Sequence, residues 1–564
     1  MSRVFEIADR YVDQIAALEP LMATSMGIPG HEREMPDLSA AGPARVAELN
    51  RKTSAELTKA QTEGEPDRIA REVILERLAI HLDLYEAQEY MRALRIIASP
   101  LQSVRSVFDQ MPKVSEDDWS NIAARLKLVP QTLAGYRQTL SEGLARKLYA
   151  SKRQAGEGAE QARLWAGLAE NEGKLSYFRQ LQESFQKMRA DKGFSDGLAR
   201  DLEAGAQAAI EGYKEIHDYL RDEYIPATSE REAAGADRYR LMARGFLGAT
   251  LDLSETYDWG WLELHRIEEE MRQTIERIVP GGAWEQAMEL LETDPLRVVE
   301  GEENYRRWLQ ELHDQALAEL HDKHFEIPEP IRRIEVMIPP PGGALAAYYT
   351  SPSEDLTRPG RTWWPTGGNT VFPKWGDVTT VYHEGVPGHH LQVAGAHMQA
   401  ERLSRYQRLA MFVSGHGEGW ALYAERLMAE LGYLENPDAS LGMLSGQALR
   451  AVRVIIDIGM HLELPIPAVE RFHPGEVWNH DLAVEFAVEK TGRPRQLMES
   501  EVVRYLGWPG QAISYKVGER YWPAAREAAK RAKGPAFDLK TFHTDALNLG
   551  PMGLEQLQRE LAQA

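Results

Sequence analysis

The stretch Val381-Tyr-His-Glu-Gly-Val-Pro-Gly-His-His-Leu-Gln392 is the part of the chain around which the rest is organised. Three histidines and one glutamate lie between His383 and His390. A His-Glu pair followed by another histidine is typical of a hydrolytic zinc site, because neutral imidazoles bind the metal and the glutamate polarises water. In the common spacing the second histidine comes four residues after the first. Here that position is Pro387.

The spacing alone leaves two interpretations open. A helix rises about 1.5 Å per residue, so in a straight helix His389 lies about 9 Å beyond His383 along the axis, and His390 about 10.5 Å beyond it. Neither pair could then share a zinc ion with bonds of about 2.0–2.1 Å. Pro387 and Gly388 could interrupt the helix and bring one histidine back to the metal. Alternatively, they simply end one helix, and no metal binds.

A second acidic stretch, His416-Gly-Glu-Gly-Trp-Ala-Leu-Tyr-Ala-Glu425, supplies candidate partners for these histidines. Glu418 and Glu425 are seven residues apart, so they share one face if the segment is helical. A catalytic zinc site with two histidines needs a third ligand, and a glutamate from a second helix meets that need. Either glutamate could instead be a solvated helix residue. The apolar residues between them favour burial, and a buried carboxylate needs a partner.

Composition indicates a globular protein and excludes several kinds of site. The 564 residues contain no cysteine, which excludes disulfides and thiolate ligands and fits a reducing compartment. The net charge of -21 argues against nucleic acid as a partner. The N-terminus shows no signal peptide, and no apolar run is long enough to span a membrane. We therefore expect a cytoplasmic protein that binds neither nucleic acid nor membrane. The oligomeric state stays open.

The periodicity of apolar residues predicts a mainly α-helical protein. Three short β-branched or aromatic segments, 332–338, 345–349 and 361–364, interrupt the helical pattern and predict a small antiparallel sheet. Near Pro328 the sequence changes from a helical pattern to short strand-like segments. This change suggests an N-terminal helical lobe over residues 1–330 and a catalytic lobe over 331–564, or one continuous domain. We expect a large, metallopeptidase-like helical fold with a deep central cleft between the lobes.

A polar stripe marks the apolar segment from Leu449 to Leu464. Arg450, Arg453, Asp457 and His461 follow one another at steps of three and four residues, which places them on one helix face. One interpretation is a ladder of ion pairs within the helix. The other is that an arginine binds a substrate carboxylate and that Asp457 or His461 supports the metal site.

Three motifs together resemble a bacterial family of domain-of-unknown-function proteins. They are His-Glu-x-x-Pro-Gly-His-His-Leu-Gln from His383, Glu-Gly-Trp-Ala-Leu-Tyr-x-Glu from Glu418, and Pro-Gly-Gln-Ala-x-Ser-Tyr-Lys-x-Gly from Pro509. The resemblance runs from about Tyr239 to the C-terminus. That family is in turn similar to gluzincin metallopeptidases, especially the helical carboxypeptidases of the carboxypeptidase Taq type.

The resemblance implies a role for individual residues. His383 and His389 match metal ligands, with His389 preferred over His390 because it follows the glycine of the motif. Glu384 matches the general base and Glu418 the third ligand.

The late Pro-Gly-Gln motif adds two further candidates. Tyr515 matches the group that stabilises the oxyanion, although a core tyrosine with a bonded hydroxyl is an equally good interpretation. Lys516 next to it, like Arg450 and Arg453, is a candidate for contact with a substrate carboxylate.

The function that these observations predict is zinc-dependent hydrolysis of short peptides, with one zinc ion and a carboxypeptidase-like preference. Two alternatives stay open. One is a catalytically degenerate, metal-free helical binding or scaffold protein, and the other is a metal-dependent amidase that acts on a non-peptide substrate.

Overall fold

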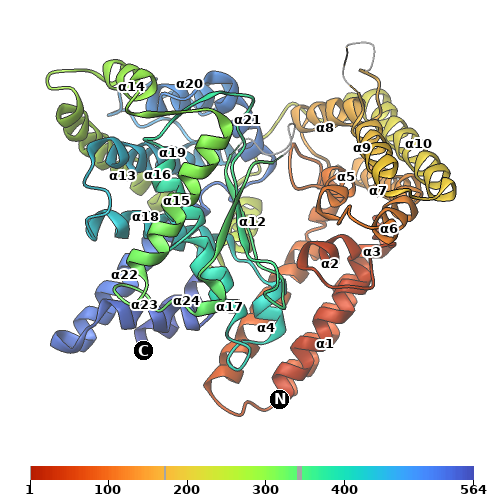
Figure 1. Ribbon diagram of the computed structural model, residues 1–564, viewed down its shortest axis with the longest axis horizontal. Helices are drawn as coiled ribbons and strands as arrows, with labels where there is room; N and C mark the ends of the chain where they lie inside the picture. The colour runs from red at the N-terminus through yellow and green to blue at the C-terminus, as the bar shows by residue number, and fades with distance from the viewer. Residues whose placement is uncertain (1, 170–172, 174, 340–345, 564) are drawn as a thin grey trace. The chain divides into compact units, whose positions relative to one another are not determined.

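The computed structural model describes residues 2–169, 173, 175–339 and 346–563 (Figure 1). Helices dominate these residues, and the strands are few and short, so the predicted mainly α-helical class with a small sheet is confirmed. Within the described ranges, no helix is both long and apolar enough to cross a membrane. The predicted central cleft stays a prediction.

The chain divides into two compact units, each formed by more than one segment. The first comprises Met1–Gln61, Arg77–Ala233 and Ser500–Trp508, and the second comprises Thr62–Glu76, Ala234–Glu499 and Pro509–Ala564. The main division therefore falls near residue 234, whereas the sequence suggested a boundary near residue 330. The physical reason is that helices between these two positions pack against C-terminal helices, which apolar periodicity alone does not reveal.

The first unit is a helical assembly around an aromatic core. Its long helix α10 packs against α6, α7, α8 and α9. A capping box begins α6, where Ser115 Oγ accepts from Asp118 N and the Asp118 carboxylate accepts from Ser115 N. The helices that fall wholly or mainly in this unit are α1 (Arg3–Leu18), α2 (Pro20–Met26), α3 (Ala41–Lys59), α5 (Pro100–Gln110), α6 (Glu116–Leu126), α7 (Val129–Ala145), α8 (Lys152–Trp165), α9 (Tyr177–Lys192), α10 (Asp196–Tyr219), α11 (Ile225–Ala227) and α21 (Arg495–Gly507), with the short helices η1 (Glu89–Arg92) and η3 (Leu220–Tyr224), while α4 (Glu65–Glu86) spans the boundary.

The second unit carries the sequence motifs on long helices that cross closely. Here α13 packs along α19, and α18 packs along α22. A Cβ on Gly419 of α18 would lie 2.4 Å from the carbonyl carbon of Gly518 of α22, so only glycine permits this crossing. The helices are α12 (Ala236–Leu247), α13 (Leu253–Ile278), α14 (Trp284–Thr293), α15 (Glu302–Leu320), α16 (Asp377–Glu384), α17 (Gly395–His397), α18 (Ser414–Glu430), α19 (Pro437–Leu462), α20 (His480–Thr491), α22 (Ser514–Lys533), α23 (Leu539–Asn548) and α24 (Leu554–Gln563), with the short helices η4 (Glu329–Ile331), η5 (His390–Ala394), η6 (Tyr406–Ala410) and η7 (Gly534–Ala536).

Two small sheets lie in the second unit. Strands β1 (Val298–Glu300) and β5 (Val371–Pro373) form an antiparallel pair. Strands β2 (Ile334–Met337), β4 (Gly360–Trp363) and β3 (Tyr348–Thr350) form a sheet in that order.

Strand β3 runs antiparallel to β4, as predicted, but β2 runs parallel to β4, with Ile334 opposite Gly360. The parallel pairing is possible because the chain between β2 and β4 is long enough to return to the starting edge. Of the three predicted strand segments, only Leu345 at the start of the second lies outside the described residues.

Candidate metal centre

The His-Glu helix does not continue through Pro387. Helix α16 ends at Glu384, and the four residues Gly385 to Gly388 form a tight connection before helical backbone resumes at His389 and continues into η5. Two hydrogen bonds close this connection: Gly388 N donates to Tyr382 O at 3.0 Å, and His390 N donates to Gly385 O at 3.0 Å. The chain thus folds back on itself. The connection accommodates the two extra residues that separate His383 from His389 compared with the common spacing of four.

Close packing fixes this connection in one geometry. A Cβ on Gly388 would lie 2.0 Å from His383 O and 2.5 Å from Tyr382 O, so no larger residue fits. From α18, Trp420 Nε1 donates to Pro387 O at 2.8 Å. Because the connection is both closed by its own backbone and held by Trp420, it presents His389 in a defined position next to His383.

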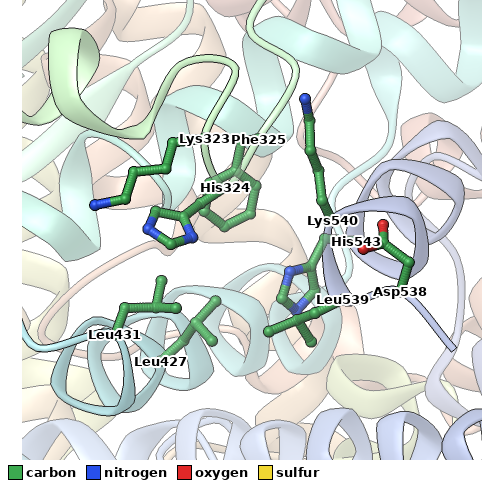
Figure 2. A pocket seen from close by; sticks show the side chains of 9 residues that line it. All are labelled: Lys323, His324, Phe325, Leu427, Leu431, Asp538, Leu539, Lys540 and His543. Carbon is green, nitrogen blue, oxygen red and sulfur yellow. The ribbon is translucent and has the colours of Figure 1, made fainter. Parts of the chain in front are cut away.

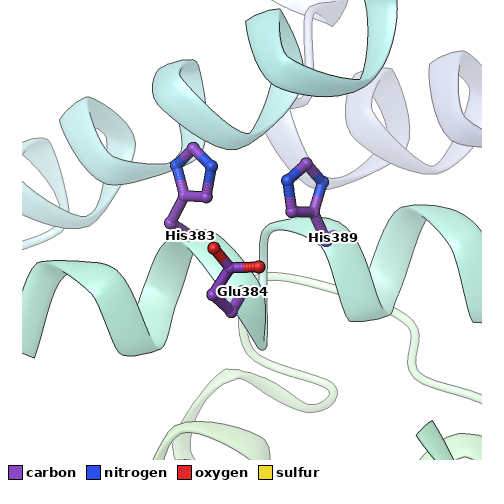
Figure 3. A group of neighbouring side chains, drawn as sticks. All are labelled: His383, Glu384 and His389. Atoms are coloured by element: carbon purple, nitrogen blue, oxygen red, sulfur yellow. The ribbon is translucent and has the colours of Figure 1, made fainter. Parts of the chain in front are cut away.

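The connection brings together residues that a straight helix would separate. The imidazole rings of His383 and His389 lie nearly perpendicular to each other with centroids 4.8 Å apart, and Glu384 lies beside them (Figure 3). Possible ligand atoms of these three buried residues all lie within 4.8 Å of one another. Helix α18 adds Glu418, whose Oε2 lies 3.4 Å from His383 Nε2 and 3.5 Å from His389 Nε2.

These separations fit a shared metal ion better than direct hydrogen bonds. Charge-assisted N–H···O bonds are about 2.7–2.9 Å long. In contrast, two atoms bonded to one tetrahedral ion at about 2.0–2.1 Å lie about 3.3–3.4 Å apart. Glu418 Oε2 is buried and has no hydrogen-bond partner among the described residues. Two imidazole nitrogens and one carboxylate oxygen are also the donor set of a catalytic zinc site.

His390, the alternative ligand, is committed to other contacts. Its Nδ1 lies 3.1 Å from Tyr349 OH, and its Nε2 lies 2.7 Å from Ile331 O. Both ring nitrogens therefore have partners in the protein, and burial lowers the pKa of His390 to about 4. The geometry thus assembles the cluster around His389.

A second carboxylate orients His383. Glu425 Oε1 lies 2.7 Å from His383 Nδ1, and Glu425 Oε2 accepts a hydrogen bond from Thr379 Oγ1 at 2.9 Å. The bond at Nδ1 fixes the ring so that Nε2 faces Glu418. Burial lowers the pKa of His383, but the neighbouring carboxylates of Glu418 and Glu425 stabilise the charged ring, outweigh burial and raise its pKa to about 10. A bound cation would have to displace that proton.

Glu384 is a buried carboxyl group next to these ligands. Only 7% of the residue is exposed. Burial raises the pKa of Glu384, while the neighbouring His383, His389 and Arg450 act in the opposite direction. A carboxyl group that gains and loses a proton readily is suited to general acid–base chemistry.

Tyr515, from the motif that begins at Pro509, lies beside the polar stripe of α19. Arg453 Cζ lies 4.8 Å from the centroid of the Tyr515 ring, and Arg450 Cζ lies 5.8 Å from it. Arg450 also lowers the pKa of both Glu384 and Glu425 through its charge. Its Nε is buried and has no hydrogen-bond partner in the described part of the chain. Arg450, Arg453 and Tyr515 are thus one cluster, and the charge of Arg450 acts on Glu384 and Glu425.

The other two residues of the stripe, Asp457 and His461, have a structural role. Asp457 Oδ2 accepts hydrogen bonds from Tyr239 OH at 2.7 Å and from Gly510 N at 3.0 Å. His461 Nδ1 accepts from Ala234 N at 3.2 Å. Within the stripe, His461 Nε2 lies 3.6 Å from Asp457 Oδ1, as the ladder predicts, and both residues also contact other segments of the chain.

Lys516 does not have the donors that the predicted substrate contact needs. Its buried ammonium group donates to Gln447 Oε1, to Glu519 Oε2 at 2.5 Å and to Glu263 Oε1 at 2.8 Å. An ammonium group has three N–H donors, so these three contacts use all of them. The structure thus places Lys516 in a buried polar network that uses its three donors.

Sequence reasoning did not identify two supporting residues, Trp420 and Thr379. The tryptophan of the Glu-Gly-Trp motif had been assigned only to apolar packing, although its indole N–H holds the connection. Thr379 lies four residues before His383, one helical turn away, and that spacing is the only sequence signal for its contact with Glu425.

Removing the indole N–H of Trp420 should loosen the connection. We expect Trp420→Phe to lose about 1–3 kcal/mol of unfolding free energy, because the buried Pro387 carbonyl loses its donor. We also expect it to bind zinc more weakly. Urea unfolding and zinc titration measure these effects. Trp522→Phe is the matched control, since Trp522 is equally buried but its Nε1 has no hydrogen-bond partner among the described residues. Equal losses of zinc affinity in both variants would contradict the assigned role.

Substituting Glu425 tests its contact with His383. Glu425→Gln keeps the shape of the side chain but removes the charge that faces His383 Nδ1. We expect zinc affinity to fall by about 10- to 100-fold, as for other groups that orient a ligand, with the fold retained. Glu430→Gln, at an exposed position on the same helix, should leave zinc affinity unchanged. Competition titration against a chelator of known affinity distinguishes these outcomes, and an unchanged affinity in Glu425→Gln would count against orientation by this carboxylate.

Two solved structures share this fold over their whole length. A structure described as "the putative lipoprotein from Colwellia psychrerythraea" matches with a TM-score of 0.83 at 23% sequence identity, covering 100% of this chain and 98% of that one. A structure described as "a putative lipoprotein of unknown function from Shewanella oneidensis" matches with a TM-score of 0.74 at 17% identity, covering 100% of both chains. At these identities the likeness shows the fold alone.

The family comparison covers nearly the whole sequence. No curated protein matches the chain. The family model described as "Bacterial protein of unknown function (DUF885)" matches residues 20–561, which include all three motifs. The predicted resemblance to a bacterial domain-of-unknown-function family is therefore confirmed, and the chain belongs to the DUF885 family.

Proposed function

We propose that this protein is a zinc-dependent peptidase that hydrolyses short peptides. The observation that supports this most strongly is that Glu418 Oε2 lies 3.4 Å from His383 Nε2 and 3.5 Å from His389 Nε2, which matches two edges of a tetrahedral site. The buried, unpartnered Glu418 Oε2 supports it further. The likeness of the motifs to gluzincin metallopeptidases is part of the same proposal.

His383, His389 and Glu418 would hold the zinc ion, and Glu425 would orient His383. When bound, zinc supplies a Lewis acid that lowers the pKa of water and polarises a carbonyl group. Glu384 accepts a proton from the attacking water and passes it to the nitrogen of the leaving amine. A carboxyl group whose pKa is raised by burial is suited to both transfers.

Tyr515 and the two arginines have the remaining roles in this proposal. Tyr515 donates its hydroxyl hydrogen to the oxyanion that forms when water attacks the peptide carbonyl. Arg450, whose Nε has no hydrogen-bond partner among the described residues, binds the C-terminal carboxylate of the substrate together with Arg453. That contact would make the enzyme a carboxypeptidase. Lys516 is left out of it because its donors are used within the protein.

Mass spectrometry of peptide mixtures tests this proposal. The zinc-loaded protein should release C-terminal residues from short peptides, and amidation of the peptide C-terminus should slow release, because the arginines lose their charged partner. Acylated amines without a peptide bond are tested beside them. Cleavage of these amines alone would replace the peptidase proposal by the amidase. Absence of any hydrolysis by zinc-loaded protein would favour a binding or scaffold role.

The cellular location is part of the proposal. The sequence alone predicts a cytoplasmic protein, whereas both structural neighbours are described as a "putative lipoprotein", which favours a location outside the cytoplasm. Fractionation of the native host, followed by detection with an antibody, separates the two. Protein in the cytoplasmic fraction supports the expectation from sequence, whereas protein in an envelope fraction supports the likeness to the neighbours.

A further inference from the structure

A pocket lies in the second unit, and none of its lining residues belongs to the candidate metal centre. It has a volume of about 180 Å³ and lies between the segment after α15, the C-terminal half of α18 and the start of α23 (Figure 2). The residues that line it are Lys323, His324, Phe325, Leu427, Leu431, Asp538, Leu539, Lys540 and His543.

One part of this pocket is apolar. Phe325 and Leu427 are buried, and Leu431, which directly follows the last residue of α18, lies four residues after Leu427. Figure 2 shows both leucines on one side of the pocket, below Phe325 and the two histidines. Such a surface favours a ligand with an apolar body, because burying apolar area is worth about 25 cal/mol per Å².

Two neutral imidazoles face each other across the pocket. Figure 2 shows the rings of His324 and His543 on opposite sides. His324 Nε2 is buried and has no hydrogen-bond partner in the described ranges. His543 is bonded through Nε2 to Tyr423 OH at 2.8 Å, and no hydrogen bond to its Nδ1 is formed among the described residues. Burial lowers the pKa of His324 and lowers that of His543 to about 3, so each ring can donate one hydrogen bond or accept one.

The charge around the pocket is positive. The Lys323 ammonium makes one hydrogen bond, to Tyr433 OH at 3.3 Å. The Lys540 ammonium donates to Asp322 O at 2.9 Å and has Glu326 at 3.9 Å. Each ammonium has three donors, so both keep unused donors. Figure 2 shows both ammonium groups at the outer ends of their side chains, turned away from the histidines, so a lysine has to swing inward to reach a ligand.

Asp538, the single acidic side chain among the lining residues, caps a helix. The Asp538 carboxylate accepts from Thr541 N and Thr541 Oγ1, each at 2.7 Å, and thereby caps α23. Its charge is thus directed to the helix N-terminus, and the two lysines outweigh it at the pocket.

We propose that this pocket binds a small organic carboxylate with an aromatic or branched apolar body. The apolar residues would contact the body, and a lysine together with an imidazole N–H would bind the carboxylate. The size agrees, because a dry apolar cavity of about 150 Å³ holds one benzene molecule. Nothing in this proposal depends on the hydrolytic reaction.

Fluorine NMR tests the proposal with 4-fluorobenzoate as the probe and 4-fluorobenzamide as its neutral isostere. We expect a dissociation constant in the millimolar range for the carboxylate, as is usual for so small a ligand. Binding of the amide should be at least about 10-fold weaker, because the amide lacks the charge that the lysines attract. Equal affinity for both probes would overturn the proposal.

Variants locate the binding. Lys540→Ala should weaken binding of 4-fluorobenzoate by about 5-fold or more, whereas Lys530→Ala, an exposed lysine on α22, should not change it. Leu431→Trp should fill the pocket and abolish binding, with circular dichroism to check the fold. His324→Leu offers a second variant of similar volume that removes an imidazole, and it should also weaken binding.

The metal centre provides the remaining control. Binding of 4-fluorobenzoate should be the same in zinc-loaded wild type and in His383→Ala. Binding that survives Leu431→Trp in a folded protein, or that disappears in His383→Ala, would place the probe elsewhere and overturn the proposal.

Discussion

Glu384→Gln is expected to lower kcat for peptide hydrolysis by about 10²- to 10⁴-fold, which corresponds to about 3–5 kcal/mol in the barrier. Glutamine has nearly the same shape as glutamate but cannot accept the proton of the attacking water. Because Glu384 is not one of the three proposed zinc ligands, the variant should bind one zinc ion as tightly as the wild type. Steady-state kinetics on a peptide that the wild type cleaves, together with zinc titration, checks both statements.

Two outcomes of that experiment would exclude the assigned role. If Glu384→Gln cleaves the peptide as fast as the wild type, Glu384 is not the general base. If activity and zinc are lost together, the glutamate holds the metal and does not merely transfer a proton. His383→Ala serves as the reference for the second outcome, since it should lose both.

Gly388→Ala is expected to disrupt the cluster although it adds only one methyl group. The new Cβ would lie 2.0 Å from His383 O, so the connection or the end of α16 must move. Overpacking of this kind costs about 1–3 kcal/mol of unfolding free energy, and more where backbone blocks the new atom. We expect zinc affinity to fall by about 100-fold or more, because a displacement of His389 by even 1 Å spoils bonds of about 2.0–2.1 Å.

Gly395→Ala is the matched control for this variant. It lies seven residues further along the same stretch, at the start of α17, and a Cβ there would meet no atom within 4 Å. Its φ of -60° is ordinary helical backbone, so alanine should stabilise the protein slightly, by about 0.4–1 kcal/mol. Thermal unfolding and zinc titration of both variants give the comparison. If Gly388→Ala retained wild-type zinc affinity, the connection would not be what brings His389 to His383.

The helical class and three of the short strands, β2, β3 and β4, were predictable because they depend on local patterns of apolar and β-branched residues, whereas β1 and β5 were not predicted. The parallel pairing of β2 with β4 was not, since it depends on how a long connection returns across the sheet. The division near residue 234 was likewise hidden, because it depends on which helices pack together. Such non-local packing leaves little trace in a single sequence.

The candidate site also depends on non-local packing that the sequence does not reveal. The motif named His383, Glu384, His389 and Glu418, and the structure brings all four together. What spacing could not decide was whether Pro387 breaks the motif or closes it. That outcome depends on the contact of Gly388 with His383 O and on the bond from Trp420, which lies on a different helix.

The contacts of other candidate side chains depend on equally non-local packing. Lys516 follows Tyr515 in a motif, but buried glutamates from two segments occupy its donors. His390 was excluded as a ligand only by its bonds to Tyr349 and Ile331, neither of which could be inferred from its position next to His389.

The metal content of the purified protein tests the central claim most directly. Wild type and His389→Ala are purified without chelator, supplied with zinc, freed of excess metal, and analysed for zinc per chain. We predict one zinc ion per chain in the wild type and almost none in His389→Ala, with both proteins folded by circular dichroism. A wild type without stoichiometric zinc, or a His389→Ala variant that retains it, would contradict the proposed metal centre.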